Sequence, residues 1–137
     1  MRECANAGMN GVEMAIVEFK KELEERTLSF SIDLMNYLFK LPSHPVFKVV
    51  IYQLAKSGSS IGANYREANR AESKPDFIHK IGIVEKESSE SHYWLTILSR
   101  VNFLEKPLQQ ELQPLLSEAE ELLKLFTTIN KKSKAAQ

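Results

Sequence analysis

Two carboxylates, Glu87 and Glu90, stand three residues apart in a stretch of otherwise apolar helical spacing. Paired acids on a helix could bind metal as in ferritin-like proteins, which use a Glu-x-x-His motif on two helices and a glutamate on each of two others. The sequence offers one related spacing, Asp76-x-x-His79, at an expected helix start. We therefore predict no metal site and no cofactor. A buried carboxylate needs a partner, and Arg66 is the one we expect, because a guanidinium binds a carboxylate through two hydrogen bonds.

Other catalytic signals are weak. Ser88 and Ser89 have no neighbouring base and orienting residue of the kind that activates a nucleophile. His44 lies in an expected loop flanked by prolines, and His79 and His92 lie on an expected helix, where a histidine is normally a solvated or capping residue. The sequence contains no phosphate-binding glycine loop and no dinucleotide-binding fingerprint. We predict that the protein is not an enzyme and has no small-molecule substrate.

Small residues dominate the stretch 57–68. They recur at helical spacing along two lines, with Ala55, Ser59 and Ala63 on one and Gly58 and Gly62 on the other. A glycine inside a helix costs about 0.5–1 kcal/mol relative to alanine, so two of them four residues apart need a reason. We expect close helix packing at Gly58, Ser59, Gly62 and Ala63.

Apolar periodicity and the positions of the prolines predict an all-α protein with four helices. The expected segments are a flexible leader over 1–11, helices at 12–41, 46–70, 73–104 and 107–131, and a basic flexible tail over 132–137. Ser73 is the expected N-cap of the third helix. In the first helix, one apolar stripe holds Leu28, Ile32, Met35 and Phe39, and the adjacent stripe holds Phe30, Leu34, Tyr37 and Leu41. Long helices with short connections favour one domain over 12–131, an antiparallel up-down-up-down four-helix bundle.

The third helix carries two apolar seams. One contains Phe77, Ile81, Val84, Leu95 and Leu98, and the other contains Ile83, Glu87, Glu90, Trp94, Ile97 and Val101. A helix in a monomeric bundle needs one apolar stripe of roughly 100°. The second seam therefore favours coverage by another chain, in a homo-oligomer. The alternative is that this helix is the central one of its own bundle and is wrapped by its neighbours.

The charges are unevenly distributed, although 18 Lys/Arg balance 18 Asp/Glu over the 137 residues. Residues 40–86 contain eight Lys/Arg and four Asp/Glu. The candidate nucleic-acid contacts are Lys48, Lys56, Arg70, Lys74 and Lys80, because phosphate binding depends on a local cluster of cations. The alternative is that these charges solvate the outer faces of a bundle.

The single cysteine, Cys4, provides no disulfide framework and fits a reducing, cytoplasmic compartment. No apolar run approaches the length of a transmembrane helix, and the first residues lack the order of a signal peptide. We expect a cytoplasmic protein without membrane contact.

Three motifs carry a resemblance to a known family. They are Ser57-Gly-Ser-Ser-Ile-Gly-Ala-Asn-Tyr-Arg-Glu-Ala68, Ala71-Glu-Ser-Lys-Pro-Asp-Phe-Ile78 and Lys86-Glu-Ser-Ser-Glu-Ser-His-Tyr-Trp-Leu95. Over about residues 25–131 the chain resembles the bacterial four helix bundle family, also known as the 23S ribosomal RNA intervening-sequence protein family. The resemblance implies a four-helix bundle that assembles as a ring-shaped homopentamer, and it implies no enzymatic activity.

By motif position, the resemblance carries a family Asn and Glu onto Asn64 and Glu67, and a pair of acids onto Glu87 and Glu90. We interpret the following as structural or interface residues: Asn64, Arg66, Glu67, Glu87, Glu90 and Trp94. A related branch, the accessory protein of diversity-generating retroelements, forms a basic pentamer that binds nucleic acid and a reverse transcriptase. This chain differs from that branch in its neutral net charge.

Together, these features predict a non-enzymatic, homo-oligomeric scaffold or interaction protein whose partner is first of all itself. The alternative is an RNA-binding accessory protein that uses a basic face of the ring, with RNA or a nucleic-acid-handling protein as its partner. A ring would present a weak basic patch several times, so avidity could compensate for modest affinity per subunit.

Overall fold

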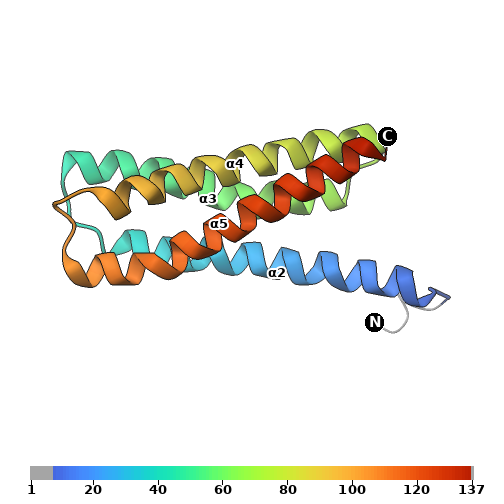
Figure 1. Cartoon of the computed structure of the whole chain (residues 1–137), viewed down its shortest axis with the longest axis horizontal. Coiled ribbons are helices and arrows are strands. Elements are labelled where there is room, and N and C mark those ends of the chain that lie inside the picture. Colours follow the sequence, from blue (N-terminus) through green and yellow to red (C-terminus); the bar gives the residue numbers. More distant parts are fainter. Residues whose placement is uncertain (1–7, 137) are drawn as a thin grey trace.

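Four helices make up the computed structural model, which describes residues 8–136. With the labels of Figure 1 they are α2 (Gly11–Phe39), α3 (Pro45–Asn69), α4 (Lys74–Arg100) and α5 (Lys106–Ala135). The described part of the chain contains no strand. The predicted all-α class with four helices is therefore confirmed.

The helix starts follow local capping signals. Asn10 and Glu13 form a capping box at the start of α2, in which the Asn10 side chain accepts from the Glu13 amide at 2.8 Å. His44 accepts from the Val46 amide at 3.1 Å before α3. Ser73 caps α4 by accepting from the Asp76 amide at 3.2 Å, as expected. Each contact satisfies an amide that has no partner inside its own helix.

The expected leader, 1–11, lies mostly outside the described residues, but its last residues form the cap and first turn of α2. The tail prediction is wrong for residues 132–135, because α5 continues to Ala135. Lysine and alanine are good helix formers, and Lys132 and Lys134 lie in the last turn, where positive charge interacts favourably with the helix dipole.

Helix α4 ends at Arg100 rather than at Leu104, because Val101 has extended backbone angles. The loop that follows covers one end of the bundle. Leu104 is buried, and the Phe103 ring lies edge-on to Phe47 with centroids 5.7 Å apart. The last apolar residues of the predicted helix thus reach the core from a loop.

Helices α3 and α4 pack most extensively, followed by α4 and α5, whereas α2 and α5 make the smallest contact. No pair of Cα atoms from α2 and α4 lies within 8 Å. Figure 1 shows the resulting shape, with α2 along one side and its N-terminal turns projecting past the ends of the other helices. Among residues 8–136, no helix combines the length and the apolar character needed to cross a bilayer.

Candidate functional site

The close contact between α2 and α3 is built on two glycines. A Cβ atom on Gly58 would overlap Cδ2 of Leu34, and one on Gly62 would lie 3.1 Å from Oγ1 of Thr27 and 3.4 Å from its carbonyl carbon. Ser31 strengthens the contact, since its hydroxyl donates to the Gly58 carbonyl at 3.2 Å. The two helices approach closely because α3 has no side chain at these two positions.

The second line of small residues lies farther out. Ser59 is half-buried, and its hydroxyl donates to the Ala55 carbonyl of its own helix at 2.7 Å. Ala63 is exposed, so the prediction of close packing at this position is wrong within the single chain. Of these two lines of small residues, the glycine line makes the closer contact with α2.

The expected partnership of Arg66 with Glu87 or Glu90 is also wrong. The Nε atom of Arg66 lies 3.7 Å from Oε1 of Glu24 on α2, and the arginine side chain is 48% exposed. Glu90 is exposed and Glu87 is half-buried. Burial and the nearby Glu90 raise the pKa of Glu87, against the opposing effect of Lys86 and Lys56. The two acids therefore lie at the edge of the bundle rather than in its core.

The remaining polar candidates make local contacts. Asn64 donates to the Ser60 carbonyl of its own helix at 2.8 Å. Glu67 accepts from Lys80 across the α3–α4 interface at 3.1 Å. Trp94 packs half-buried against the core, with the Tyr93 ring edge-on at 5.8 Å. These contacts belong to the packing of one chain.

The second seam of α4 is covered largely within the chain. Its residues Ile83, Trp94, Ile97 and Val101 are half-buried, and α4 packs against both α3 and α5. Helices α3 and α5 thus cover most of this seam, although no pair of Cα atoms from α4 and α2 lies within 8 Å and α4 is not wrapped by all three neighbours.

The surplus apolar surface lies instead on α2 and α3. Leu28, Ile32, Met35 and Phe39 form an exposed stripe along α2, and the half-buried Ile51 and Ala55 of α3 continue it. Met35, Phe39, Ile51 and Ala55 line one shallow groove. Phe39 is 93% exposed and Ile32 is 51% exposed. We call these six residues the α2–α3 apolar surface.

The candidate basic residues do not form one compact cluster. Lys80 pairs with Glu67, and Lys74 donates to the Ala136 carbonyl at 3.0 Å. Lys48 and Lys56 are exposed on α3, and Arg70 is exposed at its C-cap. Lys48 borders the groove of the α2–α3 apolar surface. The positive charge thus follows one helix rather than covering one end of the molecule.

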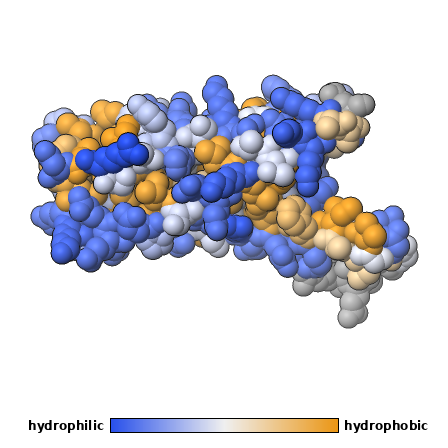
Figure 2. Space-filling view, in the orientation of Figure 1, coloured by the Kyte–Doolittle hydropathy of each residue, from blue (hydrophilic) through white to orange (hydrophobic). Residues whose placement is uncertain are grey.

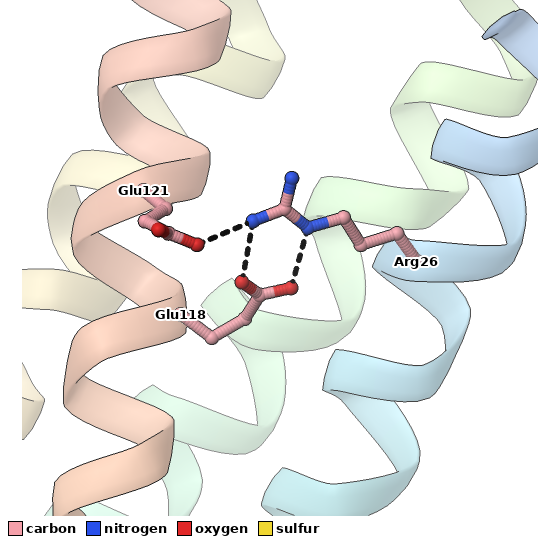
Figure 3. A network of polar contacts seen from close by, with 3 residues as sticks. All are labelled: Arg26, Glu118 and Glu121. Atoms are coloured by element: carbon pink, nitrogen blue, oxygen red, sulfur yellow. Dashed lines mark hydrogen bonds and ion pairs between the residues drawn. The ribbon is translucent and has the colours of Figure 1, made fainter.

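Sequence reasoning did not single out the polar network that joins α2 to α5 (Figure 3). Arg26 donates through Nε to Oε2 of Glu118 at 2.8 Å and through Nη2 to Oε1 of Glu118 at 2.7 Å. The same Nη2 donates to Glu121 at 2.7 Å. These contacts raise the pKa of Arg26, chiefly through the hydrogen bond to Glu118. The sequence signal that could have indicated this network is the pair Glu118 and Glu121, two acids three residues apart beside the apolar seam of α5.

Farther along the same helix pair, the Tyr37 hydroxyl donates to the Leu108 carbonyl at 2.9 Å. Burial, with a smaller effect of Glu111, raises the pKa of Tyr37 to about 12. Lys40 pairs with Glu111 at 2.9 Å nearby. Polar contacts therefore bridge α2 and α5, which have the smallest backbone contact among the helix pairs that touch.

Within residues 8–136, no group of three or more His, Cys, Asp or Glu side chains is arranged to hold a metal ion. Polar side chains in this range take part in ion pairs and hydrogen bonds, some between helices and some within one helix. The molecule is thus a four-helix-bundle protein, and its most distinctive surface feature is the α2–α3 apolar surface.

The chain belongs to the 23S rRNA-intervening sequence protein family, whose model matches residues 20–128. It is similar to the crystal structure of a protein of unknown function of the S23 ribosomal protein family from Bacteroides thetaiotaomicron. The two share 32% sequence identity with a TM-score of 0.70, over 82% of this chain and 97% of that chain. Comparison with curated proteins finds no relative of this chain. The predicted family is confirmed.

Proposed function

We propose that the protein is a non-enzymatic, cytoplasmic scaffold that assembles with copies of itself through the α2–α3 apolar surface. The observation that carries this proposal is the exposed stripe Leu28, Ile32, Met35 and Phe39, which is flanked by a groove on α3. Contiguous apolar surface of this kind on a soluble protein marks an interaction site. The ring-shaped homopentamer implied by the family resemblance is the assembly we propose.

The shape of the surface suits a second helix. The stripe on α2 has helical spacing, so it presents a straight apolar ridge. Ala55 beside it, with Ser59 and the exposed Ala63 farther along α3, leaves room for a neighbouring backbone. Helix axes approach to about 8–10 Å depending on the side chains at the contact, so small residues favour the closer packing.

A glutamate substitution in this surface tests the proposal. Ile32→Glu and Phe39→Glu place a charge where a second copy would pack, at positions that are exposed in the single chain. We expect native mass spectrometry to show a ring-sized oligomer for the wild type and to show no ring-sized species for either variant. The matched control Thr127→Glu adds the same charge to an exposed position on α5 and should leave the oligomer intact. A monomeric wild type, or oligomers unaffected by both substitutions, would overturn the proposal.

The second candidate function is RNA binding, favoured by the line of exposed cations Lys48 and Lys56 on α3 and Arg70 at its C-cap. Repetition of this line around an oligomer would add avidity. Fluorescence anisotropy with a labelled RNA tests it over a series of salt concentrations, because phosphate contacts give a salt-dependent affinity. Binding that weakens with salt and with Lys56→Glu supports this function, and the absence of binding at low salt refutes it.

A further inference from the structure

The first turns of α2, Gly11–Phe19, carry apolar side chains on nearly every side. Six of the nine residues are apolar, namely Val12, Met14, Ala15, Ile16, Val17 and Phe19. All are exposed in the single chain. A helix that is apolar all round is normally buried. We call this segment the α2 extension, and Figure 2 shows the hydrophobic surface over the projecting end of α2.

One face of the α2 extension continues the core-facing side of α2. Val12, Ile16 and Phe19 have the spacing that leads to Leu23, which is buried against the bundle. Their exposed fractions are 71%, 50% and 48%, because the other helices do not extend far enough to cover them. The α2 extension therefore exposes residues of the kind that face the core farther along α2, because no other helix covers them here.

The α2 extension is also additional to the shared domain. The family model begins at residue 20. The solved relative is matched over 97% of its length but only 82% of this chain, so this chain carries residues that the relative lacks. The capping box of Asn10 and Glu13 gives the segment a defined helical start. An added, capped and apolar helix segment is suited to a contact particular to this chain.

We propose that the α2 extensions of two copies pair in antiparallel orientation. An antiparallel register that sets Ile16 opposite Phe19 of the second copy also brings Glu13 close to Lys20 of the second copy, on one flank of the apolar face. The contact then occurs twice. A parallel pair would instead place Glu13 of one copy and Lys20 of the other on opposite sides of the contact, where they cannot pair. Charge complementarity thus selects a second copy in this orientation.

Lys20 is free to take part. Its ammonium group lies 5.9 Å from the centre of the Phe77 ring, a contact that a long side chain can exchange for a carboxylate. Since the paired segments are short, we expect an affinity of roughly micromolar or weaker for two isolated chains. If the chain forms a ring through the α2–α3 apolar surface, the extensions join two rings. The pairing itself does not depend on that ring.

Sedimentation equilibrium of the full-length chain tests the apolar contact. We expect Ile16→Glu and Phe19→Glu to halve the mass of the assembly at concentrations where the wild type is paired. Met14→Glu is the matched control, because Met14 lies on the opposite side of the same helix and should leave the mass unchanged. Circular dichroism checks that the helices are retained. Equal masses for the wild type, Ile16→Glu and Phe19→Glu would overturn the proposal.

A charge test addresses the orientation. Lys20→Glu sets two carboxylates opposite each other and should weaken pairing by about tenfold. Adding Glu13→Gln removes the repulsion and preserves the capping box, in which glutamine can replace glutamate. We expect the double variant to recover most of the wild-type affinity. If Lys20→Glu has no effect, or if Glu13→Gln recovers nothing, the antiparallel pairing is wrong. Variants at Ile32 and Phe39 report on the other surface, so the two proposals can fail separately.

Discussion

Arg26 on α2 and Glu118 on α5 form a two-point contact across the helix pair that packs least closely. The fork of the guanidinium lies against both carboxylate oxygens at 2.8 and 2.7 Å, and Glu121 accepts from the same group. Because the arginine has a planar fork, the contact fixes orientation as well as distance. Side-chain contacts thus hold these two helices where backbone packing is sparse.

We predict that Arg26→Ala lowers the free energy of unfolding by about 1 kcal/mol, near the upper end for partly exposed ion pairs. Arg26→Lys keeps the charge but loses the fork, so it should recover only part of this stability. Urea denaturation at low and high salt measures both effects. Lys40→Ala is the comparison, since its single exposed contact with Glu111 should contribute a few tenths of a kcal/mol. A cost for Arg26→Ala no greater than for Lys40→Ala would contradict this account.

The glycines of the bundle should respond to alanine in opposite ways. In Gly58→Ala, the new methyl group meets the buried Leu34 side chain, so overpacking should destabilise the protein by about 1–3 kcal/mol. Gly82 lies inside α4, and a Cβ atom added there would have no neighbour within 4 Å, so Gly82→Ala should stabilise by about 0.5–1 kcal/mol through helix propensity. Thermal unfolding of both variants compares the two. Stabilisation by Gly58→Ala would refute the close contact between α2 and α3.

Because Arg66 is partly exposed, its ion pair should contribute little to the free energy of unfolding. A guanidinium paired with buried carboxylates would cost about 3–5 kcal/mol on removal. Arg66 is instead half-exposed and 3.7 Å from Glu24, so Arg66→Ala should cost less than about 1 kcal/mol. Chemical denaturation distinguishes these values. A loss in the free energy of unfolding above about 3 kcal/mol would indicate that Arg66 is paired with buried carboxylates after all.

Glu87 should make stability depend on pH. Its raised pKa means that, between the ordinary glutamate value and the raised one, the folded state holds more protons than the unfolded state. The free energy of unfolding contributed by Glu87 therefore falls as the pH rises through this window. We expect Glu87→Gln to be more stable than the wild type at pH about 7, by about 0.5 kcal/mol, and to lose this advantage below the ordinary glutamate pKa.

Unfolding curves at a series of pH values measure this difference. Glu90→Gln serves as the comparison, because removing the neighbouring charge should lower the pKa of Glu87 and reduce the pH dependence. A Glu87→Gln variant with the same pH profile as the wild type would contradict the interpretation.

Local signals predicted the four helices well, whereas two helix ends and the pairing of residues far apart in the sequence were predicted wrongly. Ser73 and the prolines act on the nearest turn of the chain, so their effects could be inferred from neighbouring residues. The ends at Arg100 and Ala135 were missed. The first is decided by a loop that packs Leu104 into the core, and the second by helix propensity and charge in the last turn.

The sequence by itself determined that the chain forms four helices, which family it belongs to, and that Gly58 and Gly62 share one line of a helix. Only the tertiary structure decided that the stripe through Ile32 and Phe39 is exposed while the adjacent stripe through Leu34 is buried. Periodicity gives the angles between side chains on one helix, but the rotation of that helix in the bundle depends on all its neighbours at once. For the same reason Arg66 meets Glu24, a residue on another helix that no local pattern specifies as its partner.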